Sequence, residues 1–170
     1  MYPKGTRDPR LITIRRGGTL TDADHRMLAV WAADCAEHVL HFFENAHPDD
    51  RRPRFAIEQA RAWARGEISM TGARTAAFEA HAAARDASGA AKEAARASGH
   101  AVAVAHMADH ALGAAAYAIR AVRAAFEPSN ADEAGRAECL WQRDQLPDQI
   151  RELVLDDQRN QNEKCWSLFF

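Results

Sequence analysis

The stretch HAVAVAHMADHALGAAAY, residues 100–117, decides the fold, because its alanines and apolar spacing predict a long helix. Residues three, four and seven positions apart lie on one face of a helix. One face of this helix would therefore be polar, with His106, Asp109, His110, Gly113 and Tyr117. The opposite face is aliphatic and contains Val104, Ala108, Leu112, Ala115, Ile119 and Val122. We expect both faces to be buried, so the polar face needs partners and is the best candidate for a site.

The composition of the whole chain is typical of an all-α protein. It has 170 residues, 47% of them hydrophobic, which is enough for one domain with a core. Alanine is abundant and Val, Ile and Thr are sparse, which favours helix over strand. The net charge of −2 does not indicate nucleic-acid binding. The three cysteines are widely spaced, which favours reduced thiols over disulfides. The sequence shows no apolar leader and no membrane span, so we expect a cytoplasmic protein.

Caps and breakers predict six to seven helices. Thr21 and Ser69 are expected N-caps, and Pro53 suits the first turn of a helix that ends at Gly66. Residues 1–20 include LITIRR (11–16), which is either a short strand or an extended arm. The predicted helices cover residues 22–44, 53–66, 70–88, 90–97, 100–127, 129–145 and the chain from 147 onward. The sequence thus predicts a single-domain, Ala-rich helical bundle over residues 21–170 with an extended N-terminal arm over residues 1–20.

Other predicted helices contribute polar residues that could join this site. Asp34 and His38 are four apart, so Asp34 could orient the His38 ring, and His81 stands among alanines. We expect His25, His41 and His47 at the periphery. If the polar faces meet, they form a pocket for proton transfer, as in a cofactor-independent addition, cyclisation or dehydration. Its catalytic residues would be His38, His81, His106, His110, Asp34, Asp109 and Tyr117.

Two other interpretations of these residues stay open. Histidines in an Ala-rich bundle often serve as hydrogen-bonding spacers between helices. His106 and His110 are also spaced to chelate one ion, with His81, His38 or Asp109 as a third ligand. However, Met107 stands where a zincin helix has Glu, and no pair of Glu-x-x-His helices is present. We therefore predict no metal and no cofactor, and the sequence has no GxSxG, P-loop or GxGxxG motif.

The tail CWSLFF, residues 165–170, is too apolar to stay exposed without consequence. An exposed patch of Trp166, Leu168, Phe169 and Phe170 would favour aggregation. We expect these side chains to be buried against the protein's own core or against a second subunit, and we favour a homodimer.

Long segments of the chain resemble one family. They are TIRRGGTLTDADHR (13–26), LAVWAADCAEHVL (28–40), HPDDRRPRFAIEQARAWARGEI (47–68), AHAAARDA (80–87) and SGHAVAVAHMADHALGAAAYA (98–118), with a weaker match in LPDQIRELVL (146–155). These segments resemble the all-helical immunity proteins of bacterial polymorphic-toxin systems. The resemblance implies a small helical protein that binds and neutralises a partner toxin, and it provides no catalytic residues to assign. The net charge and the lack of an apolar span lead us to expect neither a nucleic-acid partner nor a membrane. The small enzyme is the alternative, and a metal- or ligand-binding module, with a small molecule between the helices, is the second.

Overall fold

The computed structural model describes residues 7–170, and that part of the chain forms seven α-helices and no β-strand. The prediction of a single all-α bundle is therefore confirmed. The helices are α1 (Asp22–Ala46), α2 (Arg52–Ala64), α3 (Met70–Arg85), α4 (Gly89–Ala103), α5 (His110–Ala125), α6 (Pro128–Asp144) and α7 (Asp148–Gln161). Within these residues, no helix has both the length and the apolar character of a membrane-spanning segment.

Local signals define several helix starts as predicted. The Thr21 side chain accepts a hydrogen bond from the Asp24 amide at 3.1 Å and begins α1. Ser69 accepts from the Gly72 amide at 3.2 Å and begins α3 in the same way. Pro53 lies in the first turn of α2, where its missing N–H costs nothing. These caps satisfy amides that a helix leaves unpaired at its N-terminus.

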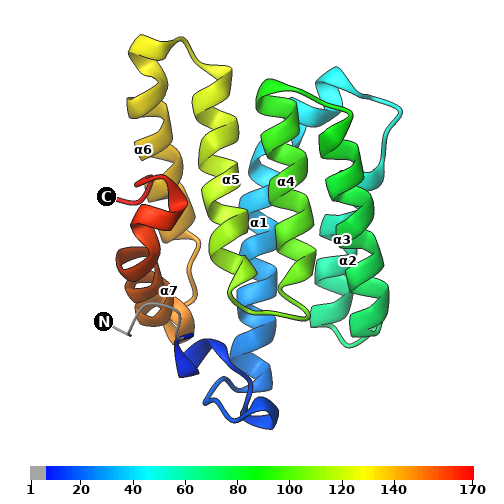
Figure 1. Cartoon of the computed structure of the whole chain (residues 1–170), viewed down its shortest axis with the longest axis vertical. Helices are drawn as coiled ribbons and strands as arrows, with labels where there is room; N and C mark the ends of the chain where they lie inside the picture. The colour runs from blue at the N-terminus through cyan, green and yellow to red at the C-terminus, as the bar shows by residue number, and fades with distance from the viewer. Residues whose placement is uncertain (1–6) are drawn as a thin grey trace.

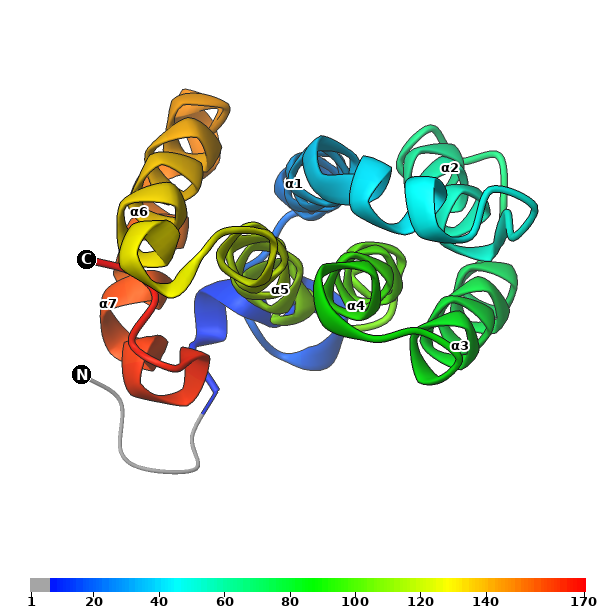
Figure 2. The ribbon, with the colours of Figure 1, turned by 90° about the horizontal axis from the view of Figure 1, so that it is seen from above.

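Helices α4 and α5 occupy the centre of the bundle. Helix α4 packs against α1, α2, α3 and α5, and α5 also packs against α1 and α6. Seen from above, α1 and α2 lie on one side of α4 and α5, α3 lies beyond α4, and α6 and α7 lie beyond α5 (Figures 1 and 2). Most of the core side chains are alanines, which let the helices approach closely. The large fully buried side chains include Trp31, Phe43, Leu28, Leu40 and Ile57.

The predicted helix over residues 100–127 is wrong, because the chain turns within it. Helix α4 continues through Gly99 and ends at Ala103, and residues 104–109 connect it to α5. The carbonyl of Val104 accepts a 2.6 Å hydrogen bond from His25 Nε2, and Arg7 pairs with Asp109 at 2.8 Å. His25, which we expected at the periphery, is only 5% exposed. These partners are distant in sequence, so tertiary contacts override the helix propensity of the turn.

The segment before α1 folds back against the helices. It forms two short 3₁₀ turns, Pro9–Leu11 and Ile14–Arg16, where the sequence suggested a strand or an extended arm. The Leu20 amide donates to the Ile12 carbonyl at 3.0 Å, and the Ile14 amide donates to the Leu20 carbonyl at 3.2 Å. Leu11 and Leu20 are buried. The LITIRR segment thus pairs with its own loop and with the core rather than with a second strand.

The C-terminal tail is buried only in part. The Phe169 amide donates to Asn162 Oδ1 at 2.9 Å, and the Phe169 side chain is buried, with Leu168 packed beside it. The expectation of burial is therefore confirmed for Phe169, and Leu168 is buried only in part against the protein's own core. Trp166 and Phe170 are not buried by the protein's own core: both are about half-exposed and lie beside the guanidinium groups of Arg120 and Arg143. Their burial against a second subunit stays a prediction. The homodimer stays a prediction.

Candidate functional site

The structure divides the predicted site residues among three places. His81, His106, His110 and Tyr117 gather where α3, α4 and α5 meet. Asp34 and His38 lie on α1 with other partners. Asp109 immediately precedes α5 and is bound by Arg7. The polar face of α1 therefore does not meet the other predicted residues, so the single pocket that the sequence suggested is not formed.

His100 lies at the centre of the first group, although it was not among the predicted residues. Its ring centroid is 5.3 Å from that of His81 and 5.1 Å from that of His110. His106 continues the series at 5.2 Å from His110, and Tyr117 stacks on His100 at 5.0 Å. The Nδ1 atoms of His100 and His110 are 3.0 Å apart, so one donates a hydrogen bond to the other. We call these five residues the histidine cluster.

Two glycines make room for the rings of the histidine cluster. A Cβ atom at Gly99 would lie 2.7 Å from the His81 ring, and one at Gly113 would lie 2.6 Å from His100 Nδ1. A Cβ atom is essentially never found this close to another heavy atom, so a larger residue would push the imidazoles away. The glycines within α4 and α5 were a sequence signal for close packing that we did not connect with His100.

The surroundings of the histidine cluster favour neutral imidazoles. Burial, with His110 and His81 nearby, lowers the pKa of His100 to about 3. Burial and the Arg96 guanidinium lower the pKa of His81 to about 4, and Arg96 donates to His81 Nδ1 at 3.0 Å. Burial also lowers the pKa of His106 and His110. At neutral pH the imidazoles of the cluster are therefore uncharged, which suits spacers between helices.

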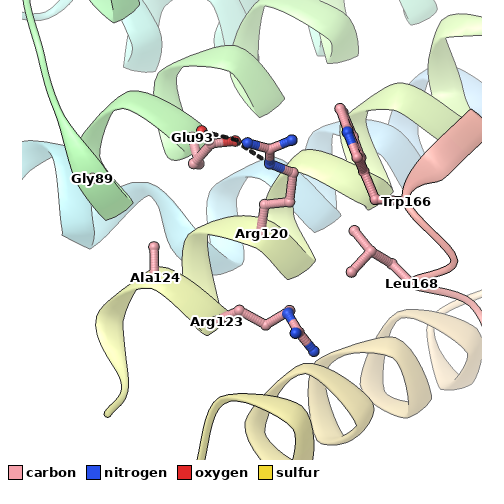
Figure 3. Close-up of a pocket in the computed structure, with 7 residues that line it drawn as sticks. All are labelled: Gly89, Glu93, Arg120, Arg123, Ala124, Trp166 and Leu168. Atoms are coloured by element: carbon pink, nitrogen blue, oxygen red, sulfur yellow. Dashed lines mark hydrogen bonds and ion pairs between the residues drawn. The ribbon is translucent and has the colours of Figure 1, made fainter. Parts of the chain in front are cut away.

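Four cavities in the described part of the chain each touch at most one of the seven predicted residues. His106 lines one of about 300 Å³, His38 one of about 390 Å³ and Asp109 one of about 270 Å³. The cavity of about 350 Å³ in Figure 3 touches none of them and is bounded by the Arg120–Glu93 ion pair and by Trp166 of the tail. The catalytic roles stay a prediction. Within residues 7–170, no three or more His, Cys, Asp or Glu side chains are arranged to hold a metal ion.

The predicted orientation of His38 by Asp34 is wrong. Asp34 accepts a 2.8 Å hydrogen bond from Arg61 of α2, which is a charge-assisted bond and therefore a strong one. His38 instead bonds to Glu138 of α6, with 2.8 Å between Nδ1 and Oε2. Its ring stacks on Trp141 with centroids 3.6 Å apart and planes 8° apart. Glu138 and Trp141 were missed because their link to His38 spans about one hundred residues.

The Glu138 carboxylate is buried, and both of its oxygens accept hydrogen bonds. Oε2 bonds to His38, and Oε1 accepts from Gln142 Nε2 at 3.2 Å. Burial raises the pKa of Glu138, while His38 and the hydrogen bonds oppose this rise. The carboxylate is thus satisfied within the protein and leaves little unmet need for a partner.

The cavity of about 390 Å³ beside this pair lies between α1 and α6, with α5 behind it. The Trp31 indole donates to the Gln142 carbonyl at 2.8 Å and, together with the His38–Glu138 pair, joins α1 to α6 at one end. From there the two helices lie on either side of α5 (Figure 2). We call this cavity the α1–α6 groove. Its lining residues are His38, His41, Phe42, Val122, Phe126, Ala134, Ala137, Glu138 and Trp141.

In the comparison with protein families, residues 18–149 match the family described as Imm-5 like putative immunity protein. The match spans most of the chain, from the loop before α1 to the start of α7. The chain belongs to this family. The α1–α6 groove and the histidine cluster of this Imm-5 like protein both lie within the matched segment. No curated protein and no solved structure significantly matches the chain.

Proposed function

We propose that this Imm-5 like protein neutralises a partner toxin by binding an apolar segment of the toxin in the α1–α6 groove. The groove is the observation that supports this function best. It is open, it is walled by aromatic and alanine side chains, and all of its lining residues lie in the segment that matches the immunity family. Family membership suggests a protein partner, and the groove offers a surface that such a partner can occupy.

The chemistry of the groove favours an apolar segment of the partner. Phe42, Phe126 and Trp141 supply aromatic surface, and such side chains are enriched in the centres of protein interfaces. Glu138 already accepts two hydrogen bonds within the protein. The partner therefore gains from burying apolar area and does not have to neutralise the buried charge.

The test measures binding of a toxin partner, which is sought among the products of the genes that flank this one. Trp141→Ala removes one wall, and Ala137→Arg fills the groove from an exposed position without removing any packing. Each variant should weaken the complex at least about 30-fold, as expected for the centre of an interface. Leu140→Ala is the matched control, because Leu140 is exposed on the same helix and does not line the groove. Isothermal titration calorimetry gives the dissociation constants, and circular dichroism checks the fold.

The two parts of the proposal fail in different ways. If the neighbouring toxin does not bind and the chain does not protect cells that express it, the immunity function is wrong. If binding is tight but Ala137→Arg and Trp141→Ala both leave it unchanged, the function stands and the toxin binds another surface.

A further inference from the structure

A smaller cavity, of about 270 Å³, lies where the segment before α1, the start of α5 and the end of α7 meet. Asp8, Asp109 and Asp157 line it, and we call it the acidic cavity. Leu11 and Leu112 add apolar surface beside the carboxylates. The acidic cavity is separate from the α1–α6 groove, with which it shares no lining residue.

Two of the three carboxylates are bound by arginines of the protein. Asp109 accepts hydrogen bonds from Arg7 at 3.0 and 2.8 Å, one to each oxygen. Asp8 accepts hydrogen bonds from Arg10, the shortest at 2.8 Å. Both pairs are bidentate, which is the strongest arrangement of these groups. Because the guanidinium groups occupy these oxygens, the cavity is poorly suited to a metal ion.

Asp157 is different from its two neighbours. Its residue is only 8% exposed, and no described residue forms a hydrogen bond or ion pair with its carboxylate. Burial, together with Asp109 and Asp8, raises the pKa of Asp157 to about 7. A buried carboxylate without a donor is costly unless it takes up a proton or meets a cation. The acidic cavity therefore contains one buried carboxyl group whose partner the described chain does not supply.

We propose that the acidic cavity binds an organic monocation, with the ammonium or guanidinium group of the ligand on the Asp157 carboxylate. The two leucines would contact the carbon chain of the ligand. This site does not depend on the proposed toxin binding. It resembles the pockets in which proteins hold a basic side chain or a small amine, with a carboxylate at the polar end and apolar walls.

The structure adds a link between this binding and pH. In the free protein Asp157 keeps a proton up to a pH of about 7, whereas the cation needs the ionised carboxylate. Binding must therefore release a proton, and the affinity should rise by up to about tenfold per pH unit below pH 7.

The probes are butylammonium and butylguanidinium, added to the full-length protein. The Asp157 carboxyl carbon is followed by NMR across a pH titration, which detects even weak binding. Each probe should lower the pH at which Asp157 titrates, and Asp157→Asn should abolish binding. Asp148→Asn removes the same charge from a fully exposed position on the same helix and should bind the probe as the wild type does. The proposal is overturned if the Asp157 titration does not move or if Asp157→Asn binds equally well.

Lys164 provides a further test, because it is exposed and lines the acidic cavity without an ion pair to Asp157. Lys164→Gln should bind the probe at least as tightly as the wild type. If the probe binds only to Lys164→Gln, the lysine is the resident cation and the proposal is wrong. Competition between a bound probe and the toxin would indicate a basic side chain of the partner as the natural ligand, and lack of competition would indicate a free amine. Both results support a cation site.

Discussion

The histidine cluster and the His38–Glu138 pair place the same side chain in opposite surroundings. In the cluster, His100 faces other imidazoles and the space above Gly113, and burial lowers its pKa to about 3. At the α1–α6 groove, His38 faces the Glu138 carboxylate, and 42% of its side chain is exposed. In this alanine-rich bundle, the groups on the neighbouring helix determine whether a histidine is buried among other rings or paired with a carboxylate. The cluster fills the space between helices with uncharged rings, and the pair lies at one end of a surface groove.

The largest expected effect is acid destabilisation through the histidine cluster. His81 and His100 stay neutral in the folded protein down to about pH 4 and 3, whereas the unfolded chain takes up protons below about pH 6.5. Their contribution to stability is therefore full above pH 6.5 and is lost as the pH falls toward 4. We expect the free energy of unfolding to fall by about 3 to 5 kcal/mol between pH 7 and 4. Urea denaturation at a series of pH values measures it.

A variant of His100 separates the loss of stability caused by the histidine cluster from the loss caused by carboxylates, which also take up protons in acid. His100→Phe keeps an aromatic ring against Tyr117 but cannot take up a proton. It should reduce the loss between pH 7 and 4 by roughly half. His41→Gln, which removes an exposed imidazole at the groove, should lose stability as steeply as the wild type. An equally steep loss in His100→Phe would show that the cluster does not resist protonation.

The sequence could predict the parts of the fold that depend on local chemistry. Thr21, Ser69 and Pro53 mark helix starts because their effect involves only the next few residues. The turn at residues 104–109 could not be predicted, because all its residues tolerate a helix. The contacts that accompany the turn come from His25 and Arg7, which lie far away in sequence. The predicted polar face was divided at this turn, and only its part from His110 onward remains on one helix.

The next effect is a steric one at Gly113. In Gly113→Ala the new Cβ would meet His100 Nδ1 at 2.6 Å, and the ring is held by His81, His110 and Tyr117. We expect a loss of about 1 to 3 kcal/mol, even though alanine has the better helix propensity. Thermal and urea denaturation measure the change.

The matched control for this steric effect is Gly72→Ala, because Gly72 has only the Ser69 hydroxyl near its missing Cβ, at 3.7 Å. This change should be neutral or stabilising by less than about 1 kcal/mol. In the double variant His100→Ala/Gly113→Ala, the glycine change should cost far less than it does alone. If the two losses of stability simply add in the double variant, Gly113 is not needed to make room for the His100 ring.

The candidate site was predictable to a similar extent. His81, His106, His110 and Tyr117 were predicted and do lie together. The choice of partners was not predictable, because it depends on which helices are neighbours. His38 has a carboxylate four residues away at Asp34, but the Arg61 guanidinium binds that carboxylate and Glu138 approaches from α6. Spacing within one helix shows which pairs can form, and packing between helices selects among them.

The smallest expected effect is that of Glu138→Gln at the other histidine site. Burial raises the pKa of Glu138, so its contribution to stability is present in acid and is lost as the pH rises through the folded pKa. Glutamine keeps the size of the side chain and an acceptor for His38 Nδ1, and it removes a buried charge. We expect a gain of less than about 1 kcal/mol at pH 8 and a smaller change at pH 5. Glu133→Gln, exposed on the same helix, is the control and should show no such dependence on pH. If Glu138→Gln instead costs as much as Gly113→Ala, the His38–Glu138 pair holds the bundle together as the cluster does, and the contrast between the buried cluster and the pair beside the groove is lost.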